Sequence, residues 1–372
     1  MEIGILTFHY AHNYGAVLQA YALKKILEIN GNNVEIINYH NSRIEKCYPF
    51  NREKSKISKV INLKEFLDLL SHNIEILRGD ITWKKQHDNF EQWINDNLRV
   101  KEEVFYLNPD LSNIKKDVFI CGSDQIWNPF LLNGFDPTYF LNFDTTARKI
   151  AYAASMGVDI LDKKMDKKFF NYLQKLNFIT VREKTLKQFI LRNMETRVEV
   201  ALDPVFLLDK EHYLKFAKKP KFDNYLLIYS LTDNTELKKV AKRIAKRKGY
   251  KCIELKYFNN IFQHNIKQIA YAGPNEFLGL IANAECIVTN SFHGTAFSMI
   301  FNKEFYCISA GSVNSRISDM LTKFKLIDRL LINSEIPEST INYNNVNSEI
   351  AEALKRSKEL LFKGIGRNEG NN

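Results

Sequence analysis

The chain has 372 residues, of which 45% are hydrophobic, and its formal net charge is +10 at pH 7. This length suits two domains with sizeable cores, and no apolar stretch approaches the roughly 20 residues that a membrane-spanning helix needs. Five cysteines, odd in number and without a CxxC pair, argue against a disulfide framework and a zinc site. No signal peptide is recognisable at the amino terminus, so we expect a soluble, cytoplasmic protein.

The basic residues are spread over many predicted helix faces, as in Lys238-Lys239, Lys242-Arg243 and Lys246-Arg247-Lys248. No RNA-binding aromatic strand or zinc finger accompanies them, so we expect no nucleic-acid partner. Anionic phosphate substrates, or an anionic membrane surface touched from the cytoplasmic side, would account for the charge equally well. A solvated basic surface without any partner is the third interpretation.

The first elements predict a parallel sheet. Apolar residues over 1–8 indicate a buried strand, helical spacing follows over 14–29, and 34–38 is typical of a second strand. Such a strand–helix–strand unit implies parallel pairing. Residues 43–60 are basic and show no period, which predicts a mobile surface excursion. The pattern then predicts helices over 62–78, 80–97, 162–175 and 183–193, and strands over 117–121, 149–153, 178–181 and 198–201.

A second alternation of strands and helices follows an interruption at Asp203-Pro204. The charged stretch 218–221, just before this second alternation, suits an interdomain linker. The alternation predicts strands over 225–230, 250–255, 286–290 and 304–308, and helices over 234–248, 274–284, 294–301, 314–327 and 348–363. The fold class is therefore α/β, with two Rossmann-like, doubly wound domains facing a cleft. We place the domains at residues 1–200 and 201–372, with the C-terminal helix packing back on the first domain.

The most informative motif is Thr289-Asn290-Ser291-Phe292-His293-Gly294-Thr295. It joins a short apolar strand to a helix, and unpaired N–H groups at a helix start favour an anion. His293 would place a proton-carrying ring beside that anion. The alternative is structural: Ser291 or Thr295 caps the helix and His293 is an ordinary turn residue.

A second motif, His12-Asn13-Tyr14-Gly15-Ala16, lies between the first strand and the first helix. Gly15 would let the backbone approach a ligand, and the helix N-terminus favours negative charge. The motif is not GxGxxG, so a dinucleotide is not expected. The alternative is a left-handed turn closed by Gly15. His9 and His12 have no carboxylate partner at ligand spacing, so no metal site is expected.

Three charged residues follow predicted strands or turns. Asp124 could orient or deprotonate a sugar hydroxyl, or cap the following turn together with Ser123. Arg182 offers a planar fork that matches carboxylate or phosphate, or pairs with an acid such as Glu183. Arg316 is a candidate second cation. Trp127 could stack on a sugar, although plain packing is the commoner role of such a residue.

Several segments resemble the polysaccharide pyruvyl transferase family, in the family's order and up to about residue 316. They are Gly4-Ile5-Leu6-Thr7-Phe8 with His12-Asn13-Tyr14-Gly15-Ala16, Cys121-Gly122-Ser123-Asp124-Gln125-Ile126-Trp127-Asn128, Val181-Arg182-Glu183, Leu202-Asp203-Pro204-Val205 and Thr289-Asn290-Ser291-Phe292-His293-Gly294. Family members resemble two-domain GT-B glycosyltransferases in fold. Characterised members transfer a pyruvyl group from phosphoenolpyruvate to a sugar, leaving a cyclic ketal.

The resemblance implies a bacterial-type transferase in which His293 and Asp124 carry the catalysis. Arg182 would hold phosphoenolpyruvate, with Arg316 at a loosely aligned position. The further binding residues expected are Asn13, Tyr14, Gly15, Ser291, Gly294 and Thr295. The second domain would bind the donor anion and the first the acceptor, and the cations meet only if the domains close. Phosphoenolpyruvate serves as co-substrate, with no separate cofactor.

The expected acceptor is a lipid- or nucleotide-linked sugar of a capsule or exopolysaccharide precursor. Two other functions fit the same fold. One is a GT-B glycosyltransferase that uses a nucleotide sugar, and the other is a non-catalytic carbohydrate- or phosphate-binding protein. The presence of Asp124, Arg182 and His293 in one chain argues against the second of these.

Overall fold

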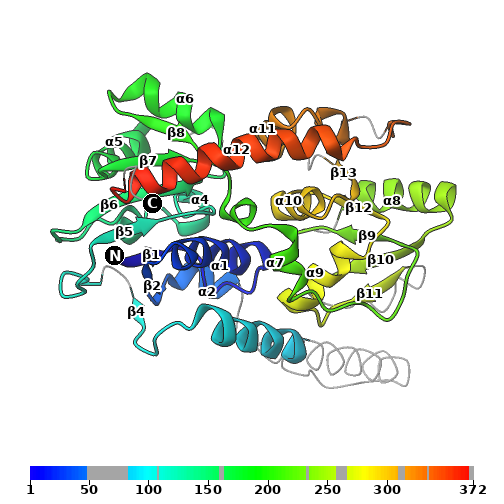
Figure 1. Cartoon of the computed structure of the whole chain (residues 1–372), viewed down its shortest axis with the longest axis horizontal. Helices are drawn as coiled ribbons and strands as arrows, with labels where there is room; N and C mark the ends of the chain where they lie inside the picture. The colour runs from blue at the N-terminus through cyan, green and yellow to red at the C-terminus, as the bar shows by residue number, and fades with distance from the viewer. Residues whose placement is uncertain are drawn as a thin grey trace, which may run out of the picture.

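The computed structural model describes residues 1–47, 83–106, 109–158, 163–231, 234–256, 266–308, 315–332 and 335–367. These ranges contain two six-stranded sheets in which every paired strand is parallel, as expected from the alternating pattern. Figure 1 shows the two sheets side by side, with helices on both faces of each. Among the described residues, no helix is both long and apolar enough to cross a bilayer.

The first sheet has the strand order β2-β1-β5-β6-β7-β8. Its strands are β1 (Glu2–Leu6), β2 (Asn33–Ile36), β5 (Val118–Cys121), β6 (Arg148–Ala154), β7 (Phe178–Val181) and β8 (Val198–Val200). Its main helices are α1 (Tyr14–Ile29), a helix over 83–98, α5 (Lys163–Leu173) and α6 (Lys184–Asn193). The central strand β5 is buried along its whole length, as its uninterrupted apolar sequence requires.

The second sheet has the order β11-β10-β9-β12-β13-β14. Its strands are β9 (Tyr225–Tyr229), β10 (Lys251–Leu255), β11 (Lys267–Ile269), β12 (Cys286–Thr289), β13 (Glu304–Ile308) and β14 (Leu330–Leu331). Its helices are α8 (Thr235–Lys248), α9 (Pro274–Ala282), α10 (Phe292–Ile300) and α11 (Ser315–Lys323). Helix α8 begins at the cap Asn234 and ends at Gly249, which takes the left-handed conformation.

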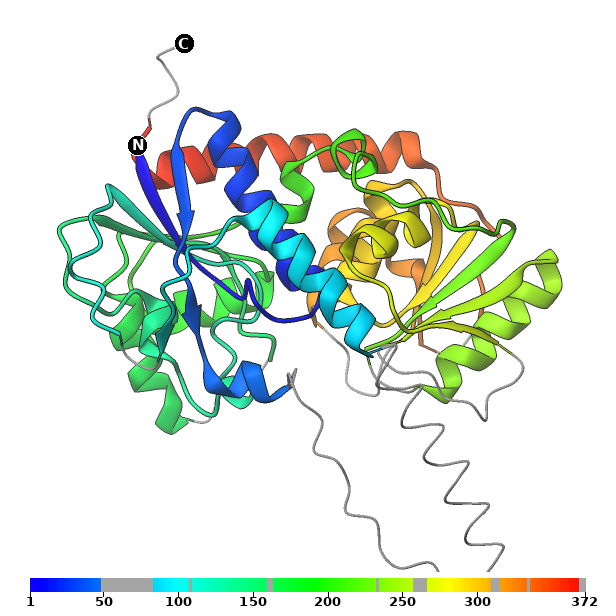
Figure 2. The same cartoon turned by 90° about the horizontal axis from the view of Figure 1, so that it is seen from below.

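Helix α12 (Tyr343–Gly364) runs along both sheets, as Figures 1 and 2 show in two orientations. The chain passes between the sheets through η2 (Pro204–Leu207) and α7 (Lys210–Leu214). The backbone N–H of Leu202 donates to the hydroxyl of Ser357 at 3.0 Å, and Arg148 donates to the carbonyl of Gly364 at 2.6 Å. The C-terminal helix is therefore attached to the first sheet and to the connection between the sheets.

The two sheets share one apolar core that includes α1, α9 and α10. At its centre the Tyr14 ring stacks on Phe277 at 4.5 Å, and its hydroxyl donates to the carbonyl of Ala272 at 2.9 Å. Residues from opposite ends of the chain are thereby held together without any ligand. Such a shared core fixes the junction at which both sheets end.

Several short elements differ from the sequence prediction. Strands β11 and β14 were not predicted, nor was the pair β3 (Tyr39–His40) and β4 (Phe105–Tyr106). They hold two or three residues each, too few for a periodic signal. The remaining short elements are α2 (Ser42–Cys47), α4 (Pro129–Leu132), η1 (Pro137–Phe140) and η3 (Ile327–Arg329). Residues 43–47 belong to α2, contrary to the expected excursion, and the rest of that excursion and the helix predicted over 62–78 lie outside the described residues.

Candidate functional site

Hydrogen bonds to Ser291 cap the first turn of α10. The Ser291 hydroxyl accepts from the N–H of Gly294 at 3.2 Å, and the Ser291 carbonyl accepts from the N–H of Thr295 at 3.0 Å. The Thr295 hydroxyl also donates to the Ser291 carbonyl. Ser291 is thus the helix cap that one interpretation of the motif proposed. Gly294 and Thr295 are buried in this turn and do not line the cavity described below, which corrects their expected role in binding.

The start of α1 is built in the same way. The Asn13 side chain caps it by accepting from the N–H groups of Gly15 at 3.0 Å and Ala16 at 3.3 Å. Tyr14 belongs to the core between the sheets, so the expectation that it binds substrate is wrong. Gly15 is not in the left-handed conformation, which removes the alternative of a turn.

Gly15 instead provides room for His293. A Cβ atom at this position would lie 1.9 Å from Nδ1 of the His293 ring, so no side chain larger than hydrogen fits. The imidazole of the second domain therefore packs directly on the first turn of α1. Gly15 acts by close packing between the domains, which corrects the expected direct contact with a ligand.

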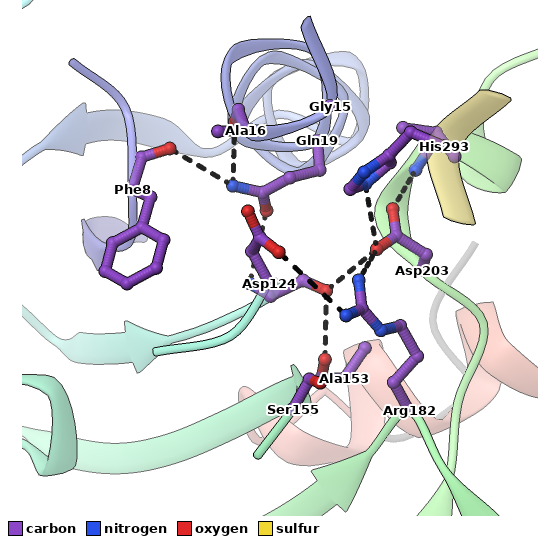
Figure 3. A network of polar contacts seen from close by, with 12 residues as sticks. Phe8, Gly15, Ala16, Gln19, Asp124, Ala153, Ser155, Arg182, Asp203 and His293 are labelled. Atoms are coloured by element: carbon purple, nitrogen blue, oxygen red, sulfur yellow. Dashed lines mark hydrogen bonds and ion pairs between the residues drawn. The ribbon is translucent and has the colours of Figure 1, made fainter. Parts of the chain in front are cut away.

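Both cationic candidates converge on the carboxylate of Asp203 (Figure 3). Nη1 of Arg182 lies 2.7 Å from Oδ2 of Asp203, and Nε2 of His293 lies 3.5 Å from the same oxygen. The Ser123 hydroxyl is 3.1 Å from Oδ2, and the N–H of Val205 donates to Oδ1 at 3.1 Å. Arg182, expected on the first domain, and His293, on the second, thus meet at one carboxylate.

Burial and neighbouring charges oppose each other at this centre. Burial alone would raise the pKa of Asp203, but the adjacent His293 and Arg182 outweigh it and leave that pKa well below its usual range. Burial alone would lower the pKa of Arg182, but the attraction of the Asp203 carboxylate outweighs burial and the pKa is raised. Burial raises the pKa of Glu183, whose carboxylate accepts from the Ser155 hydroxyl and lies 3.7 Å from Nε of Arg182.

Three further nitrogen atoms at this centre make longer contacts with carboxylate oxygens. Nε2 of His293 lies 3.5 Å from Asp203, Nε of Arg182 lies 3.7 Å from Glu183, and Nη2 of Arg182 lies 3.9 Å from Asp124. The Arg182 guanidinium is held over the ring of Phe292 at 4.3 Å, so its orientation is fixed by packing.

A cavity of 430 Å³ opens beside these groups at the junction of the domains, and we call it the central cavity. Five of the predicted site residues line it: Asn13, Asp124, Ser291, His293 and Arg316. Asp124 follows β5 in the left-handed conformation, with φ of 65°, and its Oδ1 lies 3.9 Å from Nη2 of Arg182. Arg182 lies behind this wall and borders a neighbouring cavity together with Asp203 and Arg316.

Trp127 has no part in the cavity. Its ring is completely buried and stacks on Phe140 at 5.0 Å, and its indole N–H donates to the carbonyl of Tyr139. Trp127 therefore packs in the core and does not offer its ring to a sugar in this cavity. Ser123 does not cap the following turn as proposed, because its hydroxyl faces Asp203 and the carbonyl of Ala153.

Sequence reasoning assigned no role to Asp203, the residue at the centre of the network. The signal was present, because Leu202-Asp203-Pro204-Val205 is one of the segments that resemble the family. Nothing local revealed that its partners lie at positions 123, 182 and 293. The Asp203-Pro204 motif interrupts the alternation of strands and helices. Asp203 also contacts Arg182, His293 and Ser123 at the centre of the site.

The fold and the site define a class: a two-domain α/β enzyme of the GT-B type whose polar site lies between two parallel sheets. A family model described as polysaccharide pyruvyl transferase matches residues 13–312. The chain belongs to the polysaccharide pyruvyl transferase family and is a polysaccharide-modifying transferase. The match includes every predicted site residue except Arg316.

One solved structure supports the assignment of the fold, and a second was found with a lower TM-score. UDP-GlcNAc 2-epimerase from Methanocaldococcus jannaschii, solved with UDP-GlcNAc and UDP, has a TM-score of 0.51 at 15% identity, covering 95% of this chain and 93% of that one. UDP-GlcNAc 2-epimerase from Neisseria meningitidis has a TM-score of 0.49 at 10% identity, covering 99% and 95%. At such identities only the arrangement of the elements is shared. No curated relative matches the chain in sequence.

Proposed function

We propose that this transferase moves the pyruvyl group of phosphoenolpyruvate onto a sugar of a surface-polysaccharide precursor and forms a cyclic ketal. The observation that carries the proposal is the convergence of Arg182 and His293 on Asp203, beside a cavity that His293 lines. Phosphoenolpyruvate brings a phosphate and a carboxylate, the two groups that such donors bind best. Arg316 lines both the central cavity, with His293, and the neighbouring cavity, with Arg182, and adds a further positive charge.

The chemistry requires proton transfers that the cavity can supply. Two acceptor hydroxyl oxygens bond to C2 of phosphoenolpyruvate, and the bond from C2 to the phosphate oxygen breaks. One hydroxyl proton ends on the methylene carbon, which becomes a methyl group, and the other leaves with phosphate. His293 and Asp124 line the cavity from opposite domains, and we assign these transfers to them together.

The expected acceptor is a lipid- or nucleotide-linked sugar bound on the side of the first domain. There the cavity wall includes apolar and aromatic groups such as Phe8, Trp83 and Leu131 beside the amide of Gln125. Mixed walls of this kind suit a sugar ring, which has apolar faces and polar edges.

The test incubates the purified chain with phosphoenolpyruvate and candidate lipid- and nucleotide-linked sugars. Mass spectrometry should show pyruvyl addition to one acceptor, with release of an equal amount of phosphate. In a parallel thermal-shift titration, phosphoenolpyruvate should raise the melting temperature. Arg182→Lys should weaken that shift, because an ammonium cannot copy a planar fork, whereas the exposed Arg356→Lys should not. Stabilisation by UDP-GlcNAc alone, with no effect of phosphoenolpyruvate, would overturn the proposal in favour of a nucleotide-sugar enzyme.

A further inference from the structure

We propose that His12, His87 and Glu91 form a binding site for a divalent metal ion of the zinc class. One ligand atom from each of these side chains lies within 4.8 Å of the other two. Nε2 of His12 and Oε1 of Glu91 are 2.7 Å apart, and the rings of His12 and His87 lie 4.6 Å apart between centroids. These separations are short enough for one ion to contact all three side chains.

One helix and one loop present the three side chains. His87 and Glu91 are one turn apart on the helix over 83–98, so they share a face of that helix. His12 directly precedes the helix cap Asn13, and its ring stacks on Phe90 at 5.1 Å. The ring of His87 packs against Trp83 at 5.3 Å. The ligands are thus positioned by aromatic packing rather than by an ion.

The set of donor atoms selects the metal. Two imidazoles and one carboxylate suit Zn²⁺, Co²⁺ or Ni²⁺, whereas Mg²⁺ and Ca²⁺ prefer oxygen ligands alone. Three protein ligands leave one position of a tetrahedral site open. His12 and His87 both line the central cavity, and all three residues line an adjoining cavity of 510 Å³. An ion held here would therefore be accessible to a small ligand.

No metal site is expected from the sequence, in which His9 is the neighbouring histidine of His12. The structure separates the two: His9 is buried, with its ring bonded to the amide oxygen of Asn38 and the carbonyl of Thr7. The carboxylate that meets His12 comes from a helix far along the chain. The competing explanation of the cluster is a plain hydrogen bond between His12 and Glu91 that needs no ion.

The experiment measures metal binding without any substrate, so its outcome is independent of the proposed pyruvyl transfer. The full chain, purified without a polyhistidine tag and stripped of metal, is titrated with Zn²⁺ in a calorimeter. A separate titration with Co²⁺ follows the visible absorption bands of the ion. We expect one ion per chain, with Zn²⁺ displacing Co²⁺ and excess Mg²⁺ displacing neither.

Variants locate the site. Glu91→Gln and His87→Gln should each lower the affinity for Zn²⁺ by more than about 10-fold, since changes even beyond the direct ligands cost this much. The control Asp96→Asn removes the same charge from an exposed position on the same helix and should bind like the wild type. Circular dichroism of the metal-free variants monitors folding. If His87→Gln unfolds, the Zn²⁺ affinity of Glu91→Gln provides the test, because Glu91 is half-exposed. Absence of stoichiometric binding, or equal binding by Glu91→Gln and Asp96→Asn, would overturn the proposal.

Discussion

The carboxylate of Asp203 has no exposed surface and carries two cationic partners from different parts of the chain. Without it, Arg182 would be a buried charge close only to Glu183, whose pKa is raised, and to Asp124 at 3.9 Å. Asp203 is thus a positioning residue: it fixes the orientation of both donors before any ligand arrives. The Asp203 carboxylate thereby both stabilises the fold and orients the side chains of the site.

Replacing Asp203 by Asn should cost about 3–5 kcal/mol of unfolding free energy at neutral pH, because one partner of a buried ion pair is lost. The folded pKa of Asp203 lies below its unfolded value of about 3.9, so its contribution is fully present above that value. The contribution is lost as the pH falls through the folded pKa. Urea unfolding of both proteins should therefore show a difference at neutral pH that shrinks below about pH 4. A difference that persists unchanged in acid would contradict the ion-pair account.

The His293→Gln substitution should stop turnover while leaving the fold intact. Glutamine keeps a hydrogen-bonding group at the end of the side chain but cannot carry the titrating proton. A rate loss of roughly 10²–10⁴-fold is the scale for a general acid or base. His212→Gln is the matched control, since that ring is bound to the hydroxyl of Tyr21 and does not line the cavity. Full activity at every donor concentration would remove His293 from the chemistry.

At the scale of elements, the junction of α1 and α10 depends on one missing Cβ atom. Gly15→Ala should lower both the melting temperature and the activity, because the added methyl group would overlap the ring of His293. The double variant Gly15→Ala with His293→Ala removes the ring and should recover most of the lost melting temperature, although not the activity. Differential scanning calorimetry of the four proteins measures this coupling. Additive losses would mean that the two residues do not meet in solution.

The same junction shows which features the sequence could predict. Helix α1 and strand β7 were predicted with their observed bounds, because apolar residues recur at helical spacing in the first and predominate in the second. Helix α12 begins at Tyr343, earlier than predicted, because its first turn is polar and lacks a period. The structure places His293, Asp124 and Arg316 on the wall of one cavity. The packing of Tyr14 and Gly15 and the ion pairs of Asp203 were not predicted, because each depends on a contact between distant parts of the chain.

At the scale of the whole molecule, the two sheets behave as one body. The shared core, the stacking of Tyr14 on Phe277 and the passage of α12 along both sheets all connect them. The meeting of Arg182 and His293 at Asp203 is therefore a property of the assembled fold.

The net charge of +10 leads to a prediction about the surface. The basic stretch over 43–64 lies outside the described residues beyond 47, but α8 presents an exposed row of cations: Lys239, Lys242, Arg243, Lys246, Arg247 and Lys248. A lipid-linked acceptor would bring the protein to an anionic membrane, where each basic residue contributes about 1 kcal/mol. Sedimentation with anionic liposomes should therefore show binding that fades as salt is added, and none with neutral liposomes.

Two charge-matched variants test whether α8 makes that contact. Lys242→Gln with Lys246→Gln should weaken liposome binding by about 2 kcal/mol, on the basis of about 1 kcal/mol per residue. Lys167→Gln with Lys355→Gln removes the same charge from exposed positions on α5 and α12 and should weaken binding less. Binding that does not depend on salt, or none at low salt, would defeat the idea of an electrostatic membrane contact. Equal weakening by both pairs would mean that overall charge, rather than the face formed by α8, attracts the protein to the bilayer.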